Sequence, residues 1–430
     1  MPQCFHHSQP LLCAQWEGQR GVDAPNESCE KEGHVSRTDR GGVHEAKLNA
    51  DDRWSVPDIE HNCFHGGYST QPASHRFALT NKLISKKKVA FPVRSDLQDY
   101  LDQHGRAMTI PVTYEDLLRF EGSMAILDKD DRDTLWVDCL YAQGERDELV
   151  TNLKRLYSIL HADGSDTILP FLTVDSIAYC TFGNTKPFRI KVRNIINDNY
   201  LFLYVKRCDA SRIYGLELEQ LLSPNRINFL VHGNTLIEEH IVGIPGDVFI
   251  EERLPALTLQ DQRALAKEFV QFNERCCLRL LGDMRSYNYV VVITQDFDRI
   301  QYRIRAIDFD QQSYEGNARV YQPEHLPENA QFAEMTSVVL PKASIEQYVK
   351  EERALLARRA AGEHLRLKQL LMCMREDELS ASDKVDELKG ALLALTGDVN
   401  FKRAGNMGGI LEAALDFIQR NFKTDSPFAS

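Results

Sequence analysis

The chain lacks three features that would place it in a broad class at once. No apolar run reaches the roughly 20 residues of a membrane-spanning helix, and the amino terminus has no basic stretch followed by an apolar one. Positive charge is not in surplus either, since 51 Lys and Arg against 63 Asp and Glu give a net charge of -12. We therefore expect no membrane span, no export signal and no nucleic-acid partner, because binding a phosphate backbone requires clustered cations.

The chain also lacks the regular cysteine spacings of a disulfide framework or a zinc site. It has 10 cysteines, and no two of them form a Cys-x2-Cys pair. His61, Cys63 and His65 could supply three metal ligands but leave the fourth unassigned. We expect reduced thiols in a cytoplasmic protein, and no structural zinc.

The composition divides the chain into four segments. Residues 1–78 are poor in aliphatic residues and show no periodicity, so we expect a disordered tail. Residues 79–172 alternate helical and extended patterns and predict an accessory α/β region. Residues 173–250 are rich in strand patterns with one helix predicted over 210–222, and helical patterns dominate residues 251–430. Strands first and helices second is typical of the α+β class.

One string in the helical part, GDMRSYN at residues 282–288, combines an acid, a cation and an amide. It follows a helix predicted over residues 260–281 and precedes the apolar run YVVVI. A carboxylate such as that of Asp283 can accept the proton of a hydroxyl, and the amide oxygen of Asn288 can bind Mg²⁺. Arg285 could neutralise a transferring phosphoryl group or bind an anionic acceptor, and a surface salt bridge is the alternative.

A second acid ends an extended segment that is predicted over residues 300–307. Asp308 follows the apolar alternation RIRAI and precedes Phe309 and Asp310. Mg²⁺ typically takes one or two carboxylates together with phosphate oxygens, so Asp308, Asn288 and a nucleotide could form a magnesium site. The alternative is structural, because Asp and Asn are common in turns and Asp308 with Asp310 could be a surface acid pair.

The order Gly-Asp-x4-Asn, an extended pair and Ile-Asp-Phe-Asp resembles the catalytic and metal-binding loops of kinase-like phosphotransferases. It looks closest to the aminoglycoside and choline kinase branch, which likewise lacks the glycine after Asp-Phe. The resemblance implies a two-lobed protein-kinase-like fold, with an antiparallel-sheet amino lobe over residues 173–250 and a mainly helical carboxyl lobe over 251–430. It implies an ATP- and Mg²⁺-dependent kinase in which Asp283 orients the acceptor hydroxyl.

The resemblance also implies three nucleotide-binding features in the amino lobe. Lys206, at the end of the third strand, would hold the phosphates, and an acid on the following helix, Glu217 or Glu219, would orient this lysine. Gly183 lies in the loop that would cover the phosphates. The hinge that binds the base is expected at Glu239, His240 and Ile241.

Several departures from the family pattern bear on the activity. The phosphate-covering loop has one glycine, Leu281 stands where many relatives have His, and no Ala-Pro-Glu anchor follows Asp308. The alternatives to a kinase are a pseudokinase or regulatory nucleotide-binding module and, less favoured, transfer of a nucleotidyl group by the same fold. The segment after Asp308 does not resemble a long activation loop, which favours a small-molecule or unusual protein acceptor.

Overall fold

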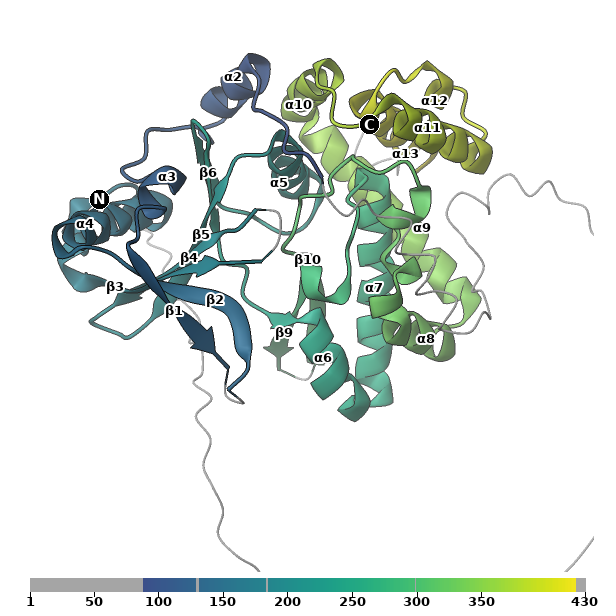
Figure 1. The fold of residues 1–430 in the computed structure, drawn as a ribbon. Coiled ribbons are helices and arrows are strands. Elements are labelled where there is room, and N and C mark those ends of the chain that lie inside the picture. The colour runs from purple at the N-terminus through teal and green to yellow at the C-terminus, as the bar shows by residue number, and fades with distance from the viewer. Residues whose placement is uncertain (1–87, 129–130, 183–184, 298, 423–430) are drawn as a thin grey trace, which may run out of the picture. The chain divides into compact units, whose positions relative to one another are not determined.

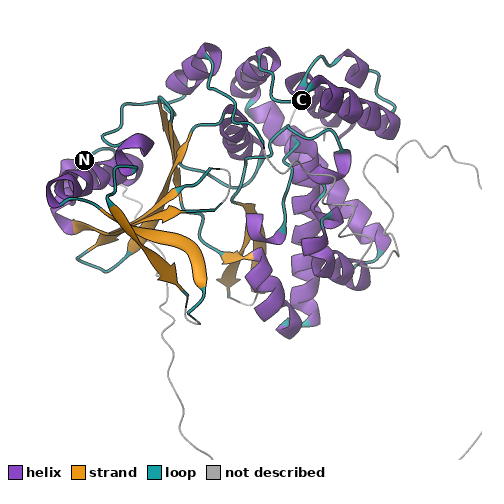
Figure 2. Cartoon of the chain, viewed as in Figure 1, coloured by secondary structure: helices purple, strands orange, loops and turns teal. Residues whose placement is uncertain are grey.

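The computed structural model describes residues 88–128, 131–182, 185–297 and 299–422. The tail predicted over residues 1–78 lies outside these described residues. Within them, helices and antiparallel sheets are both abundant (Figure 2), which confirms the predicted α+β class.

The larger sheet has seven antiparallel strands in the order β1-β2-β3-β4-β5-β7-β6 (Figure 1). Alternate residues of the fourth strand, Phe188, Ile190 and Val192, are buried because successive side chains of a strand point to opposite faces. The strands are β1 (Gly122–Leu127), β2 (Asp133–Leu140), β3 (Leu172–Cys180), β4 (Phe188–Asn194), β5 (Tyr200–Arg207), β6 (Phe229–His232) and β7 (Thr235–Glu239).

One face of this sheet is covered by α4 (Gln143–His161), with the short helix α3 (Tyr114–Leu117) nearby. Leu149, Leu153 and Leu156 recur at helical spacing along α4 and join the apolar residues of the strands in one buried cluster. Burial of this stripe against the strands stabilises both elements.

The sheet continues across the boundary that the sequence predicts at residue 172. Strands β1 and β2 come from the predicted accessory region, yet β2 pairs with β3 through Trp136 opposite Cys180 and Asp138 opposite Ala178. The accessory residues therefore extend the same sheet that contains β3, β4 and β5.

Helix α5 (Ala210–Leu222) connects β5 to β6 and is buried along nearly its whole length. It packs against the segment after Asp308, where a Cβ atom on Gly215 would come within 2.9 Å of Phe309 Cβ. A glycine at this position therefore permits the close approach of the two segments. Helix α2 (Ser95–Gln103) lies beside α10 in the helical part.

The remaining described residues form mainly helices and one small sheet. The helices are α6 (Gly246–Glu252), α7 (Leu259–Arg279), α8 (Ala330–Val339), α9 (Lys342–Gly362), α10 (His364–Glu376), α11 (Ser382–Thr396), α12 (Asn400–Arg403) and α13 (Met407–Phe422). The small sheet has the order β10-β9-β8, with β8 (Ile244–Pro245), β9 (Tyr289–Asp296) and β10 (Arg299–Ala306). Short 3-10 helices are Asp166–Phe171, Leu254–Ala256, Ser286–Asn288, Ala318–Tyr321, Pro323–His325 and Pro327–Asn329.

The loop of residues 282–288 follows directly from the turn at the end of α7. The Thr258 side chain accepts a hydrogen bond from Asp261 N at the start of α7, and Leu280 ends the helix with a left-handed φ of 55°. The chain then turns through Gly282, whose N–H donates to Gln311 O at 3.2 Å. This bond ties the loop to the segment that follows Asp308.

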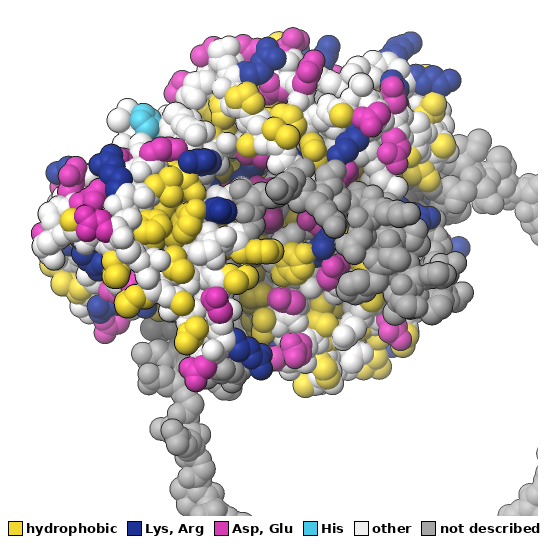
Figure 3. Space-filling model, viewed as in Figure 1, with side chains coloured by type: hydrophobic (Ala, Val, Ile, Leu, Met, Phe, Trp, Pro, Cys, Tyr) yellow, Lys and Arg dark blue, Asp and Glu magenta, His cyan; other side chains and the backbone are white. Residues whose placement is uncertain are grey.

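The described surface is mixed in charge. On the face drawn in Figure 3, acidic and basic side chains are interspersed, and outside the grey atoms no extended field of Lys and Arg is visible. Within the described residues, no helix has both the length and the apolar character needed to cross a membrane.

Candidate functional site

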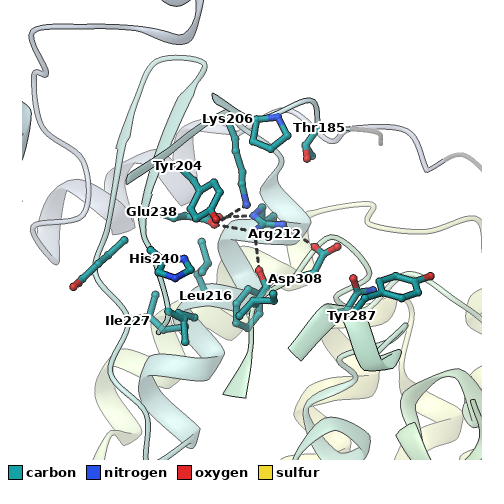
Figure 4. Close-up of a pocket in the computed structure, with 16 residues that line it drawn as sticks. Thr185, Tyr204, Lys206, Arg212, Leu216, Ile227, Glu238, His240, Tyr287 and Asp308 are labelled. Carbon is teal, nitrogen blue, oxygen red and sulfur yellow. Dashed lines mark hydrogen bonds and ion pairs between the residues drawn. The ribbon is translucent and has the colours of Figure 1, made fainter. Parts of the chain in front are cut away.

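A cavity opens where β5, α5, the end of β7, the loop of residues 282–288 and the segment after β10 come together (Figure 4). Its volume is about 240 Å³, slightly smaller than the cavities that usually hold drug-sized ligands. Predicted site residues from separate parts of the chain line its wall: Lys206, Glu239, His240, Ile241, Asn288 and Asp308. Gly183 lies outside the described residues.

Lys206 is buried in this cavity and forms an ion pair with Glu238. Its Nζ donates to Glu238 Oε2 at 2.8 Å. Lys206 lies opposite Leu236 in the β5–β7 ladder, and residues two apart on a strand share a face, so Glu238 stands diagonally across from the lysine. The register of two adjacent strands therefore determines the partner of Lys206.

The predicted pairing of Lys206 with Glu217 or Glu219 is wrong in this structure. Glu217 is fully buried and accepts from Arg366 Nη2 at 2.6 Å, while Glu219 forms a buried ion pair with Arg279. Both carboxylates are thus neutralised by cations outside the cavity.

The geometry of α5 explains this correction. Arg212 and Leu216 are four residues apart, share one helix face and line the cavity. Glu217 lies off this face and meets Arg366 of α10. Glu219 lies on the same side as Arg212 but two turns further along, where it meets Arg279 of α7 and not the cavity. Because α5 is buried on several sides, its apolar pattern does not reveal which face meets β5.

Arg212 is a cavity residue that the sequence analysis missed. Its Nη1 donates to Asp308 Oδ1 at 2.8 Å and to Asp310 Oδ1 at 2.7 Å, and its Nη2 donates to Glu238 Oε2 at 2.8 Å. The Arg212 side chain is 2% exposed. One planar guanidinium therefore connects three carboxylates from two parts of the chain.

Glu238 is the second cavity residue that was missed. Burial disfavours its charged form, but the cations of Arg212 and Lys206 outweigh burial and lower the pKa of Glu238 to about 2. The only sequence signal was an acid inside the otherwise apolar strand TLIEE, directly before the predicted hinge.

Asp308 follows β10 and presents one carboxylate oxygen to its protein partners. Oδ1 accepts from Arg212 and from the backbone N of Asp310 at 3.0 Å. Burial and the nearby Asp310 carboxylate raise the pKa of Asp308, against the opposing effect of Arg212. In the described part of the chain, nothing hydrogen-bonds to Oδ2 of Asp308 or to Oδ1 of Asn288.

Asp283 lies beside the cavity and is connected to it through Asn288. Asn288 Nδ2 donates to the Asp283 backbone O at 2.8 Å, and Asp283 itself has a left-handed φ of 59°. Burial raises the pKa of the Asp283 carboxyl to about 6, although the Arg285 cation acts in the opposite direction. The Asn288 amide thus contacts the Asp283 backbone and holds both residues in one compact loop.

Arg285 forms the salt bridge that was the alternative interpretation of this residue. Its Nε donates to Asp283 Oδ1 at 2.7 Å, and its Nη1 contacts Glu328 Oε1 at 3.3 Å and Tyr287 OH at 3.1 Å. Contact with a phosphoryl group or an anionic acceptor stays a prediction.

The predicted hinge follows directly from β7. Glu239 ends this strand, and His240 N donates to Phe202 O at 3.0 Å, which keeps the chain extended beside β5. The His240 ring lies 5.8 Å from the Tyr204 ring. Burial and then the Arg189 cation lower the pKa of His240, so its ring is neutral at pH 7.

Comparison with models of known protein families finds no match. Nor does any curated protein match the chain. The functional inference therefore rests on the geometry of the cavity and the loop of residues 282–288.

The donor set of the cavity fits a divalent cation that is shared with a ligand. In the residues that the structure describes, no group of three or more His, Cys, Asp and Glu could hold a metal alone. Asp308 and Asn288 offer two oxygens on one wall, and Mg²⁺ commonly binds through one or two protein oxygens, phosphate oxygens and water. Cations at Lys206 and Arg212 add positive charge to this wall.

Proposed function

We propose that the chain is an ATP- and Mg²⁺-dependent phosphotransferase with a two-lobed, protein-kinase-like architecture. It would act on a hydroxyl group of a small-molecule or unusual protein acceptor. One observation carries the proposal: six residues, predicted from motifs between positions 206 and 308, line a single cavity. They are Lys206, Glu239, His240, Ile241, Asn288 and Asp308.

The order of the surrounding elements supports the same architecture. Counting from β3, Lys206 stands on the third strand and α5 follows it. Strand β7 then leads through His240 and Ile241 to the helical part of the chain. The loop with Asp283 follows a long helix, α7, as the sequence pattern predicts.

The positions of the hinge residues and of Lys206 in the cavity suggest how a nucleotide would lie in it. The base would meet His240 and Ile241 at the end of β7, and the phosphates would meet Lys206. Mg²⁺, when bound, would neutralise phosphate charge and would be held by Asp308 Oδ2 and Asn288 Oδ1. Neither oxygen has a hydrogen-bond partner among the described residues.

Asp283 would orient the acceptor hydroxyl and accept its proton as the oxygen attacks the γ-phosphorus. The bond from that phosphorus to the β-phosphate oxygen breaks, and ADP leaves with this oxygen. A pKa of about 6 keeps Asp283 ionised at neutral pH and close to the range that suits a general base. Arg285 holds Oδ1 of Asp283, which leaves Oδ2 for the acceptor.

A second candidate function is nucleotide binding without transfer. It is favoured by the hold of Arg212 on Asp308, because one of the two carboxylate oxygens that could bind metal is already paired. A regulatory nucleotide-binding module would need the cavity but not Asp283.

The experiment that separates these functions uses γ-labelled and α-labelled ATP with Mg²⁺, alone and with a metabolite extract. Transfer of the γ-label to an extract component, lost in Asp283→Asn, would support a kinase. Transfer of the α-label alone would exclude phosphoryl transfer. Saturable ATP binding without transfer of either label would select the regulatory module.

A further inference from the structure

The ion pairs of the cavity form a continuous chain from Lys206 to Asp308. Lys206 on β5 contacts Glu238 on β7, Glu238 contacts Arg212 on α5, and Arg212 contacts Asp308 after β10. Figure 4 shows these contacts as dashed lines that cross the cavity wall. The residue that would hold phosphate and the residue that would hold metal are thus linked by two intermediates.

The two intermediates are buried, so their geometry is tightly constrained. The side chain of Arg212 is 2% exposed and that of Glu238 is 8% exposed. A buried charge that loses its partner is strongly destabilised, because the interior cannot replace its hydration. Each member of this chain therefore has a large energetic reason to keep its contacts.

Arg212 is also fixed by the packing of its own helix. The Ser211 hydroxyl donates to Gln312 O at 2.7 Å, and Gly215 lies against Phe309. These contacts attach α5 to the same segment that carries Asp308. The guanidinium consequently meets Asp308 from a rigid base, and its fork can bond Glu238 at the same time.

The contact with Arg212 selects which oxygen of Asp308 stays free. Oδ1 accepts from Arg212 Nη1 and from the backbone N of Asp310, which leaves Oδ2 on the cavity wall. Mutation of a residue that fixes the orientation of a metal ligand typically lowers metal affinity by roughly 10- to 100-fold.

We propose that Arg212 and Glu238 are positioning residues of the nucleotide site. Arg212 holds Asp308 so that Oδ2 faces the divalent cation, and Glu238 holds both Arg212 and Lys206. Helix α5 thus acts on the metal ligand through an arginine, instead of acting on Lys206 through a glutamate. This inference rests on the proposed function, because it assumes that a metal-bound nucleotide occupies the cavity.

The competing arrangement has an acid of α5 turning toward Lys206 when the nucleotide binds. Glu217 would then have to leave Arg106, at 2.9 Å, Arg366, at 2.6 Å, and the Tyr100 hydroxyl, at 2.6 Å. Three buried or half-buried partners would lose their carboxylate at once. Glu217→Gln tests this arrangement directly.

The experiment measures ATP binding to the full chain by calorimetry, with and without Mn²⁺, and counts bound Mn²⁺ by electron paramagnetic resonance. For Arg212→Met we expect the Mn²⁺-dependent gain in ATP affinity to fall by roughly 10- to 100-fold. Arg212→Lys should restore little of it, because an ammonium cannot bond Asp308 and Glu238 as a planar fork does. Glu238→Gln should lower the same gain.

Arg353→Met is the matched control. Arg353 is also a buried arginine, and its Nε donates to Glu274 Oε1 at 2.7 Å, but it lies on α9 and does not line the cavity. Arg353→Met should lower the midpoint of thermal unfolding and leave the Mn²⁺-dependent gain in ATP affinity unchanged. If Arg212→Met does not fold, Arg212→Lys and Glu238→Gln decide the question.

Four results would overturn the inference. An undiminished Mn²⁺-dependent gain in the Arg212 and Glu238 variants would do so, as would loss of the gain in Glu217→Gln instead. If the wild-type protein binds ATP but gains no affinity from Mn²⁺, the inference is wrong while nucleotide binding stands. Wild-type protein that binds no ATP under either condition would remove the proposed function as well.

Discussion

Buried ion pairs are found both on the side of α5 that faces the cavity and on the side that faces away from it. On the side that faces the cavity, Arg212 is bonded to acids whose other atoms reach the cavity wall. On the outer side, Glu217 is bonded to Arg106 and to Arg366, and the contact with Arg366 ties α5 to α10. A buried ion pair alone therefore does not mark a functional residue; its place relative to the cavity does.

The largest expected effect comes from removing the proposed metal ligand on the cavity side. Asp308→Ala should abolish Mg²⁺-dependent nucleotide turnover, because it removes the carboxylate oxygen that is proposed to bind the cation. Turnover would be followed with γ-labelled ATP, and circular dichroism would show whether the fold is retained. Undiminished turnover would contradict the assignment of Asp308.

A change on the outer side should affect stability and leave the cavity intact. Glu217→Gln leaves Arg106 and Arg366 without their shared carboxylate, and we expect a loss of about 2–3 kcal/mol in unfolding free energy. Urea denaturation measures this loss. ATP affinity should stay within about threefold of wild type, and a larger drop would erase the distinction between the two sides.

The contact between α5 and the segment after Asp308 can be tested at Gly215. In Gly215→Ala the new Cβ would lie 2.9 Å from Phe309 Cβ, which is closer than real side chains approach. We expect overpacking to cost about 1–3 kcal/mol and to weaken Mn²⁺-dependent ATP binding, since the strain is applied next to Asp308. Gly390→Ala is a suitable control, because its Cβ would meet no atom within 4 Å.

A buried acid outside α5 should have the smallest effect on the cavity. Burial and the nearby Glu274 raise the pKa of Glu324 from 4.5 to about 7. The folded state then binds more protons than the unfolded state between pH 4.5 and 7, so this residue lowers stability as pH rises through that window. Glu324→Gln should raise the unfolding free energy at pH 8 by up to roughly 3 kcal/mol and change it little at pH 4.

The check for Glu324 is urea denaturation across pH 4 to 8. A variant whose stability differs from wild type by the same amount at both ends would show that Glu324 is ionised to the same degree in both states. In contrast to Glu324, Glu238 is kept ionised by the cations of Arg212 and Lys206, which are its two neighbours in the chain of ion pairs.

Local patterns in the sequence predicted the elements that carry the site. The helix expected over residues 210–222 is α5 (Ala210–Leu222), and β7 (Thr235–Glu239) lies in the segment of residues 173–250 that was expected to be rich in strands. Both elements have strong local signals: α5 begins after the N-capping residue Asp209, and β7 is an apolar strand between turns. The positions of Asn288 and Asp308 on one cavity wall also follow from the motif.

The partner of Lys206 could not be predicted, because it depends on the register of β5 against β7 and not on spacing along the chain. The correct acid, Glu238, is 32 residues away in sequence and adjacent only once the strands pair. Strand β1 (Gly122–Leu127) was also missed, since GSMAIL has little β-branched character and its pairing with β2 supplies the order. Tertiary contacts decide both cases.

The most direct test of the central claim is to react the full chain with an ATP acyl-phosphate, which acylates a lysine beside the bound phosphates, and to map the label by peptide mass spectrometry. We expect Lys206 to be labelled, and we expect excess ATP with Mg²⁺ to prevent the labelling. Labelling spread over surface lysines, unaffected by ATP, with Lys206 unmodified would contradict this expectation.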